Sequence, residues 1–73
     1  MNEYQKNAIK YLKAQIKVAK KFKEENNILQ YNIVTGMIRE NLGYCVTLGI
    51  FSYKKYGMLL KISDNMLNSI WPI

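Results

Sequence analysis

Two opposed patterns of side chains run along residues 2–25. Apolar side chains recur at the three- and four-residue spacing of one helical face, and Gln15 is the only polar residue among them. This face consists of Tyr4, Ala8, Tyr11, Leu12, Gln15, Ile16, Ala19 and Phe22. The lysines recur on the opposite side, at positions 6, 10, 13, 17 and 20/21. Because no glycine or proline interrupts it, we predict an amphipathic helix that ends in the polar sequence Glu24-Glu25-Asn26-Asn27.

Residues 28–42 form a second candidate helix. Asn27 and Gln30 have the spacing of a capping box, and Gly43 is placed to end the helix in a left-handed conformation. The apolar side chains of this segment point in nearly every direction, which indicates a helix buried on most sides. The alternative is a strand over Ile28–Thr35, where apolar side chains alternate with polar ones in part of the segment. The two caps favour the helix.

The next stretch predicts a β-hairpin. Residues 44–53 are rich in β-branched and aromatic side chains that nearly alternate, a pattern typical of a strand. Lys54-Lys55-Tyr56-Gly57 has glycine in the last position of a four-residue turn. Residues 58–63 would form the return strand, with one face of the hairpin apolar.

A short helix is predicted near the C-terminal end. Ser63-Asp64-Asn65 supplies N-cap chemistry and Pro72 ends the segment. The predicted order of elements is therefore α-α-β-β-α. We expect a small α+β domain over residues 1–73, in which two helices pack on one face of the hairpin and the short last helix closes the end.

The size and composition of the chain limit what it can do. Its 73 residues, 49% of them hydrophobic, suffice for one small domain whose thin stability margin a partner or a second copy could supplement. No apolar segment approaches the roughly 20 residues of a membrane span, and no signal peptide is visible. The single cysteine, Cys45, lies among apolar residues and has no internal disulfide partner, which favours a reducing, cytoplasmic location.

Catalytic and cofactor chemistry find little support in the sequence. The chain has no histidine for acid–base catalysis near neutral pH or for a zinc site. Its five carboxylates are scattered, its serines have no histidine base, and its four glycines form no phosphate-binding loop. We therefore expect a protein that is not an enzyme and that carries no cofactor or metal.

The net charge of +6 lies entirely on the first 23 residues. Seven lysines and one acid, Glu3, fall in this segment, whereas four cations and four acids cancel in residues 24–73. Like charges at helical spacing repel by about 0.2–0.5 kcal/mol per pair, a cost that indicates an anionic partner. The alternative interpretation is a solvated face that only keeps a small protein in solution.

The favoured function is a non-catalytic accessory that binds nucleic-acid backbone beside a larger enzyme of DNA or RNA metabolism, such as a replication or repair factor. The lysines would contact phosphates, the hairpin tip would extend this footprint by stacking and charge, and an apolar tail would dock on the protein partner. The candidate residues are Lys6, Lys10, Lys13, Lys17 and Lys21 on the first helix, Lys54, Lys55 and Tyr56 at the tip, and Met66, Leu67, Ile70 and Trp71 in the tail. The alternative function is a modulator or inhibitor of a larger protein, for instance one encoded by a mobile element, with no nucleic-acid contact.

Overall fold

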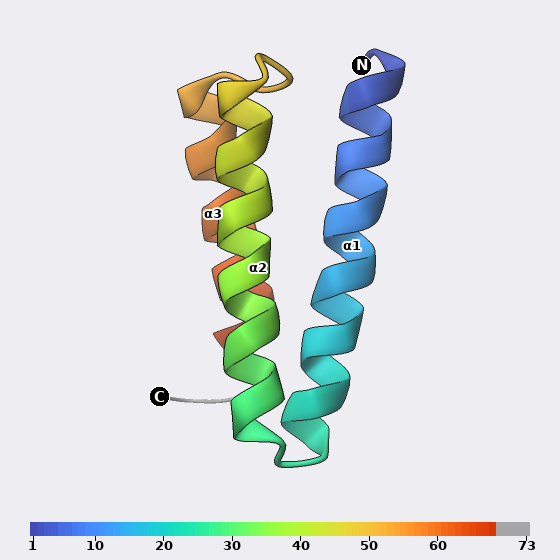
Figure 1. The fold of residues 1–73 in the computed structure, drawn as a ribbon, viewed down its shortest axis with the longest axis vertical. Helices are drawn as coiled ribbons and strands as arrows, with labels where there is room; N and C mark the ends of the chain where they lie inside the picture. The colour runs from blue at the N-terminus through green and yellow to red at the C-terminus, as the bar shows by residue number, and fades with distance from the viewer. Residues whose placement is uncertain (69–73) are drawn as a thin grey trace.

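The computed structural model describes residues 1–68, and within this range the chain forms three helices and no strand. α1 spans Glu3–Glu24, α2 spans Ile28–Thr47 and α3 spans Tyr53–Asn68 (Figure 1). Successive helices run antiparallel, so the N-terminus of α1 lies at the same end of the molecule as the connection between α2 and α3. The predicted α+β fold is therefore wrong, and the described part of the chain is a three-helix bundle.

The predicted first helix is confirmed, with its end in the predicted polar sequence, and hydrogen bonds at both ends explain its bounds. The Asn2 side chain accepts a hydrogen bond from the backbone N–H of Gln5, whose own side chain accepts one from the N–H of Asn2. At the other end, Asn26 adopts a left-handed φ of 57°. The N–H groups of Asn26 and Asn27 then bond to carbonyls in the last turn of α1. This cap reverses the chain and places Asn27 at the start of the next helix.

α2 begins where the sequence predicts. The side chain of Asn27 accepts a hydrogen bond from the N–H of Gln30, and the first helical residue is Ile28. The alternative of a strand over Ile28–Thr35 is therefore wrong.

α2 continues past Gly43, where the sequence predicts its end, into the residues expected to form the first strand. Gly43 lies inside the helix, and the residue that adopts the left-handed conformation is Gly49, with a φ of 76°. The N–H groups of Gly49 and Ile50 bond to carbonyls in the last turn of α2, as in a Schellman motif. The strand predicted over 44–53 is therefore wrong, since its first half is helix and most of the rest is the connection to α3.

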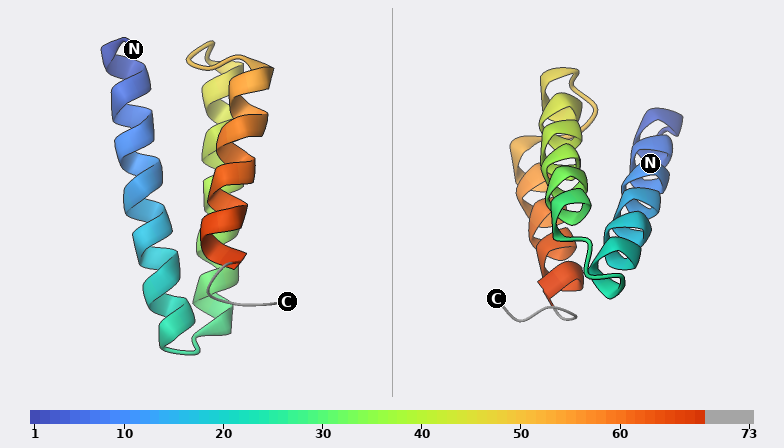
Figure 2. Two further views of the ribbon diagram at one scale, coloured as in Figure 1. Left: turned by 180° about the vertical axis from the view of Figure 1, so that it is seen from behind. Right: turned by 60° about the horizontal axis from the view of Figure 1, so that its bottom comes forward.

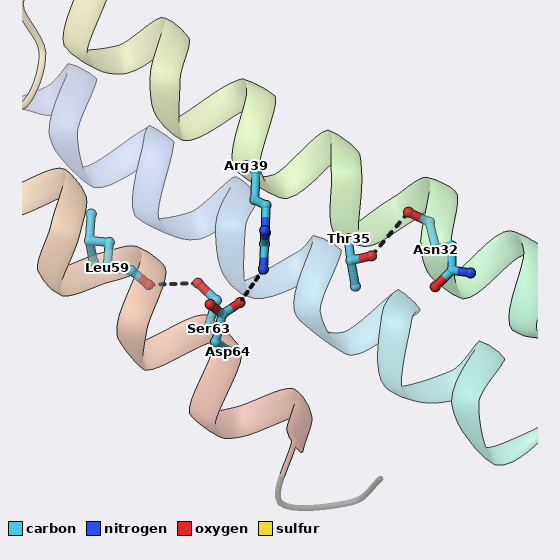
Figure 3. Close-up of polar contacts among 6 residues, drawn as sticks. All are labelled: Asn32, Thr35, Arg39, Leu59, Ser63 and Asp64. Carbon is cyan, nitrogen blue, oxygen red and sulfur yellow. Dashed lines mark hydrogen bonds and ion pairs between the residues drawn. The ribbon is translucent and has the colours of Figure 1, made fainter. Parts of the chain in front are cut away.

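The predicted turn, the return strand and the described part of the predicted last helix all lie in α3. The hydroxyl of Ser52 accepts a hydrogen bond from the N–H of Lys55, so the predicted turn over 54–57 is the capped first turn of the helix. Ser63, expected to cap a separate helix, lies in the middle of α3. Its buried hydroxyl donates to the carbonyl of Leu59 at 2.6 Å (Figure 3), so the helix satisfies this polar group internally.

The core draws apolar side chains from all three helices and from the α2–α3 connection. Its buried members are Leu12, Ile16, Ala19, Tyr31, Ile38, Leu42, Phe51, Leu59 and Leu67. The side-chain amide of Gln5 donates to the carbonyl of Ile50 at 3.0 Å, which ties the first turn of α1 to the connection. Arg39 and Asp64 form an exposed ion pair at 3.4 Å between α2 and α3 (Figure 3), a contact that adds little stability in water.

α3 covers only one side of the α1–α2 pair. In Figure 1 it lies behind α2, and the view from behind in Figure 2 shows it alongside α2 with α1 to one side. The molecule is elongated, with extents of 36 × 18 × 17 Å. No other helix of the described chain covers the opposite side of the α1–α2 pair.

Candidate nucleic-acid interface

The five lysines of α1 that are predicted to contact phosphates are all exposed. We call Lys6, Lys10, Lys13, Lys17 and Lys21 the lysine face. At 1.5 Å per residue these positions extend over roughly 22 Å of the helix. Within residues 1–68, none of the five ammonium groups forms an ion pair or a hydrogen bond. The two acids of α1 lie at its ends, so the lysine face is a row of uncompensated positive charge.

The other two lysines of α1 have different environments. Lys20 is half-buried at the edge of the lysine face. Lys23 is only 3% exposed, and its ammonium donates to the carbonyl of Leu67 in the last turn of α3. The same ammonium lies 5.0 Å from the centre of the Tyr31 ring, and burial lowers the pKa of the Lys23 amine. Lys23 therefore holds the C-terminal end of α3 against α1 and adds nothing to the exposed charge.

The second predicted group lies on the first turn of α3, and there is no hairpin tip. Lys54 is exposed, whereas Lys55 and Tyr56 are half-buried. Lys55 lines a hollow together with the first turn of α1, so this group lies at the Lys6 end of the lysine face. The accessible ring is that of Tyr53, which meets the Tyr56 ring edge to face with 6.3 Å between centroids. The structure thus places this second group beside the Lys6 end of the lysine face, with Tyr53 as the exposed aromatic residue.

The predicted docking tail contains residues in different environments. Leu67 is 3% exposed and belongs to the core, whereas Met66 is exposed on α3. Ile70 and Trp71 lie outside the described residues. Leu67 therefore stabilises the bundle, and Met66 is the tail residue whose side chain reaches the surface of the described structure.

A second surface, which the sequence pattern did not indicate, is a groove between α1 and α2. Its walls are Tyr11, Ala14 and Val18 on α1 and Val34 and Met37 on α2, and they enclose about 240 Å³. We call this surface the α1–α2 groove. The heptad spacing of Tyr4, Tyr11 and Val18 is the sequence signal that could have found it, since it places large apolar residues along one edge of the helix.

Gln15 lies in the α1–α2 groove and is 7% exposed. Its side-chain nitrogen is buried and has no hydrogen-bond partner in the described part of the chain. Buried amide groups in native proteins are nearly always paired, because an unpaired donor loses its hydration without compensation. Gln15 is therefore a polar group whose partner the bundle itself does not supply.

Other chemistry is limited in the described residues. They contain no cluster of side chains that could hold a metal ion, and none of their helices combines the length and apolar character needed to cross a membrane. Cys45 is half-buried, and burial raises the pKa of its thiol, which makes it a poor nucleophile at neutral pH.

No family model matches the chain, and comparisons with curated proteins and with solved structures give no significant match.

Proposed function

We propose that the protein is a non-catalytic accessory that binds the phosphate backbone of nucleic acid through the lysine face of α1. The observation that carries this proposal is the row of five exposed ammonium groups with no ion-pair partner among residues 1–68. Like charges one turn apart repel by about 0.2–0.5 kcal/mol per pair. A bound polyanion attracts the same ammonium groups and so offsets this repulsion. A face that served only solubility would gain from interspersed acids, and the lysine face has none between its ends.

The chemistry of lysine defines the kind of contact. Its ammonium is a point charge on a flexible stem, so it follows phosphates without distinguishing bases, and binding is independent of sequence. Each phosphate contact releases condensed counterions, which makes the affinity fall steeply with salt. At the Lys6 end, Lys54 adds a cation and the exposed Tyr53 ring offers a stacking surface for an unpaired base.

Such a protein would act beside a larger enzyme of DNA or RNA metabolism, such as a replication or repair factor, in the cytoplasm. The larger enzyme would supply the chemistry, because this chain has no histidine and a single half-buried cysteine. The bundle would hold the nucleic acid by its backbone, a role that requires surface charge and a rigid helix.

The test compares equal charge changes on different faces. Lys17→Glu removes a cation from the lysine face, and Lys61→Glu makes the same change on the exposed side of α3. We expect Lys17→Glu to weaken binding of a labelled oligonucleotide, measured by fluorescence anisotropy, by at least fivefold, and Lys61→Glu to change it less than twofold. The triple variant Lys10→Glu, Lys13→Glu, Lys17→Glu should abolish binding while its circular dichroism stays helical. Equal effects of the two single variants would reject the lysine face as the binding surface.

A second candidate function is a modulator or inhibitor of a larger protein, with no nucleic-acid contact. The observation that favours it is the α1–α2 groove, where apolar side chains are exposed beside the lysine face. The lysine face would then meet an acidic protein surface and speed the encounter. The two functions are separated by a pull-down with the tagged protein after nuclease treatment. A single dominant protein recovered without nucleic acid supports the modulator, and recovery that depends on nucleic acid supports the accessory.

A further inference from the structure

Large apolar side chains of α1 and α2 remain exposed in the structure. Tyr11, Val18, Ile33 and Met37 are each 43–54% exposed although all four are apolar. Tyr11, Val18 and Met37 line the α1–α2 groove from both helices, and Ile33 lies one helical turn before Met37 on α2. In four-helix bundles, a groove between two antiparallel helices is filled by the apolar stripe of another helix. The shape and side chains of this groove therefore suit a helix.

The buried amide of Gln15 adds a polar requirement inside the same groove. Its nitrogen is unpartnered in the described residues, and the side chain lines both this groove and a smaller hollow beside it, to which Asn41 and Cys45 of α2 contribute. An occupant that places a carbonyl or a side-chain oxygen at this point would satisfy the donor. Gln15 is thus the one polar residue in the lining of this groove.

The charge along the groove defines the occupant further. Lys10 and Lys17 lie one helical turn from Ala14. Val18 lines both the groove and a neighbouring hollow, whose other residues are three lysines and one acid: Lys17, Lys20, Lys21 and Glu24. The α1 edge of the groove is therefore cationic. An occupant with carboxylates along that edge gains charge pairing, whereas a second copy of this chain would bring another +6 to the same place.

We propose that the α1–α2 groove binds an amphipathic helix of a partner protein, with an apolar stripe in the groove and carboxylates along the edge that faces α1. The apolar part of this site is distinct from the lysine face, since Ile33 and Met37 lie on α2 and carry no charge, and the two surfaces share only the lysines at the α1 edge. The bound helix completes a four-helix bundle and attaches this protein to a larger one. The mode of recognition is helix-in-groove, in which anchors one turn apart enter the apolar surface.

The probe is a synthetic helix of roughly four turns, with leucine on the stripe that faces the groove and glutamate along one edge. The control peptide carries lysine in place of each glutamate. We expect the acidic peptide to bind one to one in calorimetry, and to shift the NMR signals of Ala14, Met37 and the Gln15 side-chain amide. The lysine peptide should bind at least tenfold more weakly. Equal binding of both peptides, or shifts confined to other surfaces, would overturn the proposal.

Matched variants locate the site. The pair Ile33→Ser, Met37→Ser removes two exposed apolar side chains from α2, and the pair Met58→Ser, Ile62→Ser removes the same two residue types, similarly exposed, from α3. The α2 pair should weaken the acidic peptide at least tenfold and the α3 pair less than twofold, with both variants helical by circular dichroism. Equal losses, or sedimentation that shows dimers broken by the α2 pair, would overturn the partner assignment. Oligonucleotide binding should be unchanged in the α2 pair, so this proposal and the proposed function fail independently.

Discussion

Replacing Gly57 with alanine tests the helical fold where it departs most from the sequence pattern. Gly57 lies inside α3 with a φ in the ordinary negative range, and a Cβ built there meets nothing within 4 Å. Alanine is therefore accommodated without strain and gains helix propensity, so we expect Gly57→Ala to raise the free energy of unfolding by about 0.5–1 kcal/mol. For a domain of this size the corresponding rise in Tm is about 2–8 °C.

The control is Gly49→Ala, because Gly49 has a φ of 76° that strains any residue with a Cβ. We expect this change to lower the free energy of unfolding by about 1–2 kcal/mol. Both variants are measured by urea denaturation followed by circular dichroism at the helical minimum. A β-hairpin would give the opposite order, since it places Gly57 in a turn that favours glycine and Gly49 inside a strand. Destabilisation by Gly57→Ala, with Gly49→Ala neutral or stabilising, would refute the three-helix assignment.

Three further predictions concern the interior. Ile38→Ala, at a core position 2% exposed, should lower the free energy of unfolding by about 2–5 kcal/mol in urea, and a loss below 1 kcal/mol would contradict the packing. Lys23→Ala should lower the free energy of unfolding by about 1–3 kcal/mol, because the Leu67 carbonyl loses its donor. The control Lys13→Ala, at an exposed position, should lower it by less than about 0.5 kcal/mol, and equal losses would show that Lys23 is solvated. Because burial raises the pKa of the Cys45 thiol, less thiolate is present at a given pH, so alkylation by iodoacetamide should reach its half-maximal rate at a higher pH in the folded protein than in urea. Identical pH profiles would contradict the burial of this thiol.

The parts of the fold that follow from local sequence are the helix caps. Asn2, Asn27 and the turn around Asn26 set the limits of α1 and the start of α2, and their hydrogen bonds lie within a few residues of each other. Capping geometry is local, so these caps can be predicted from neighbouring residues, whereas the caps predicted at Gly43 and Ser63 fall inside α2 and α3.

The second half of the chain could not be predicted in this way because packing overrides a weak local preference. Residues 44–47 have strand-forming side chains, yet they extend α2 toward the Schellman motif at Gly49. Strand propensity spans only about 1 kcal/mol, less than the burial of one large core side chain contributes. In α3 the buried residues Leu59, Ser63 and Leu67 recur at helical spacing, but the middle one is polar. The Ser63 hydroxyl bonds to the helix backbone, so this residue can occupy a core position that the apolar pattern does not indicate.

In the candidate site, too, some features follow from local sequence and others depend on tertiary packing. The positions of the lysine face follow from helical spacing, and all five residues are exposed as that spacing requires. Lys23 lies four residues after Ala19 and seven after Ile16, so its spacing matches the buried face and its charge is withdrawn into the bundle. The α1–α2 groove depends on which side α3 covers, a tertiary property that no single-helix pattern contains.

The most direct test of phosphate binding by α1 is the salt dependence of oligonucleotide affinity. If the five exposed ammonium groups each meet a phosphate, the plot of log affinity against log salt should have a slope of about −4.5 on duplex DNA or about −3.5 on a single strand. A single change, Lys13→Gln, should make that slope less steep by about 1. An affinity that does not vary with salt, or a slope that the substitution leaves unchanged, would contradict phosphate binding by the lysine face.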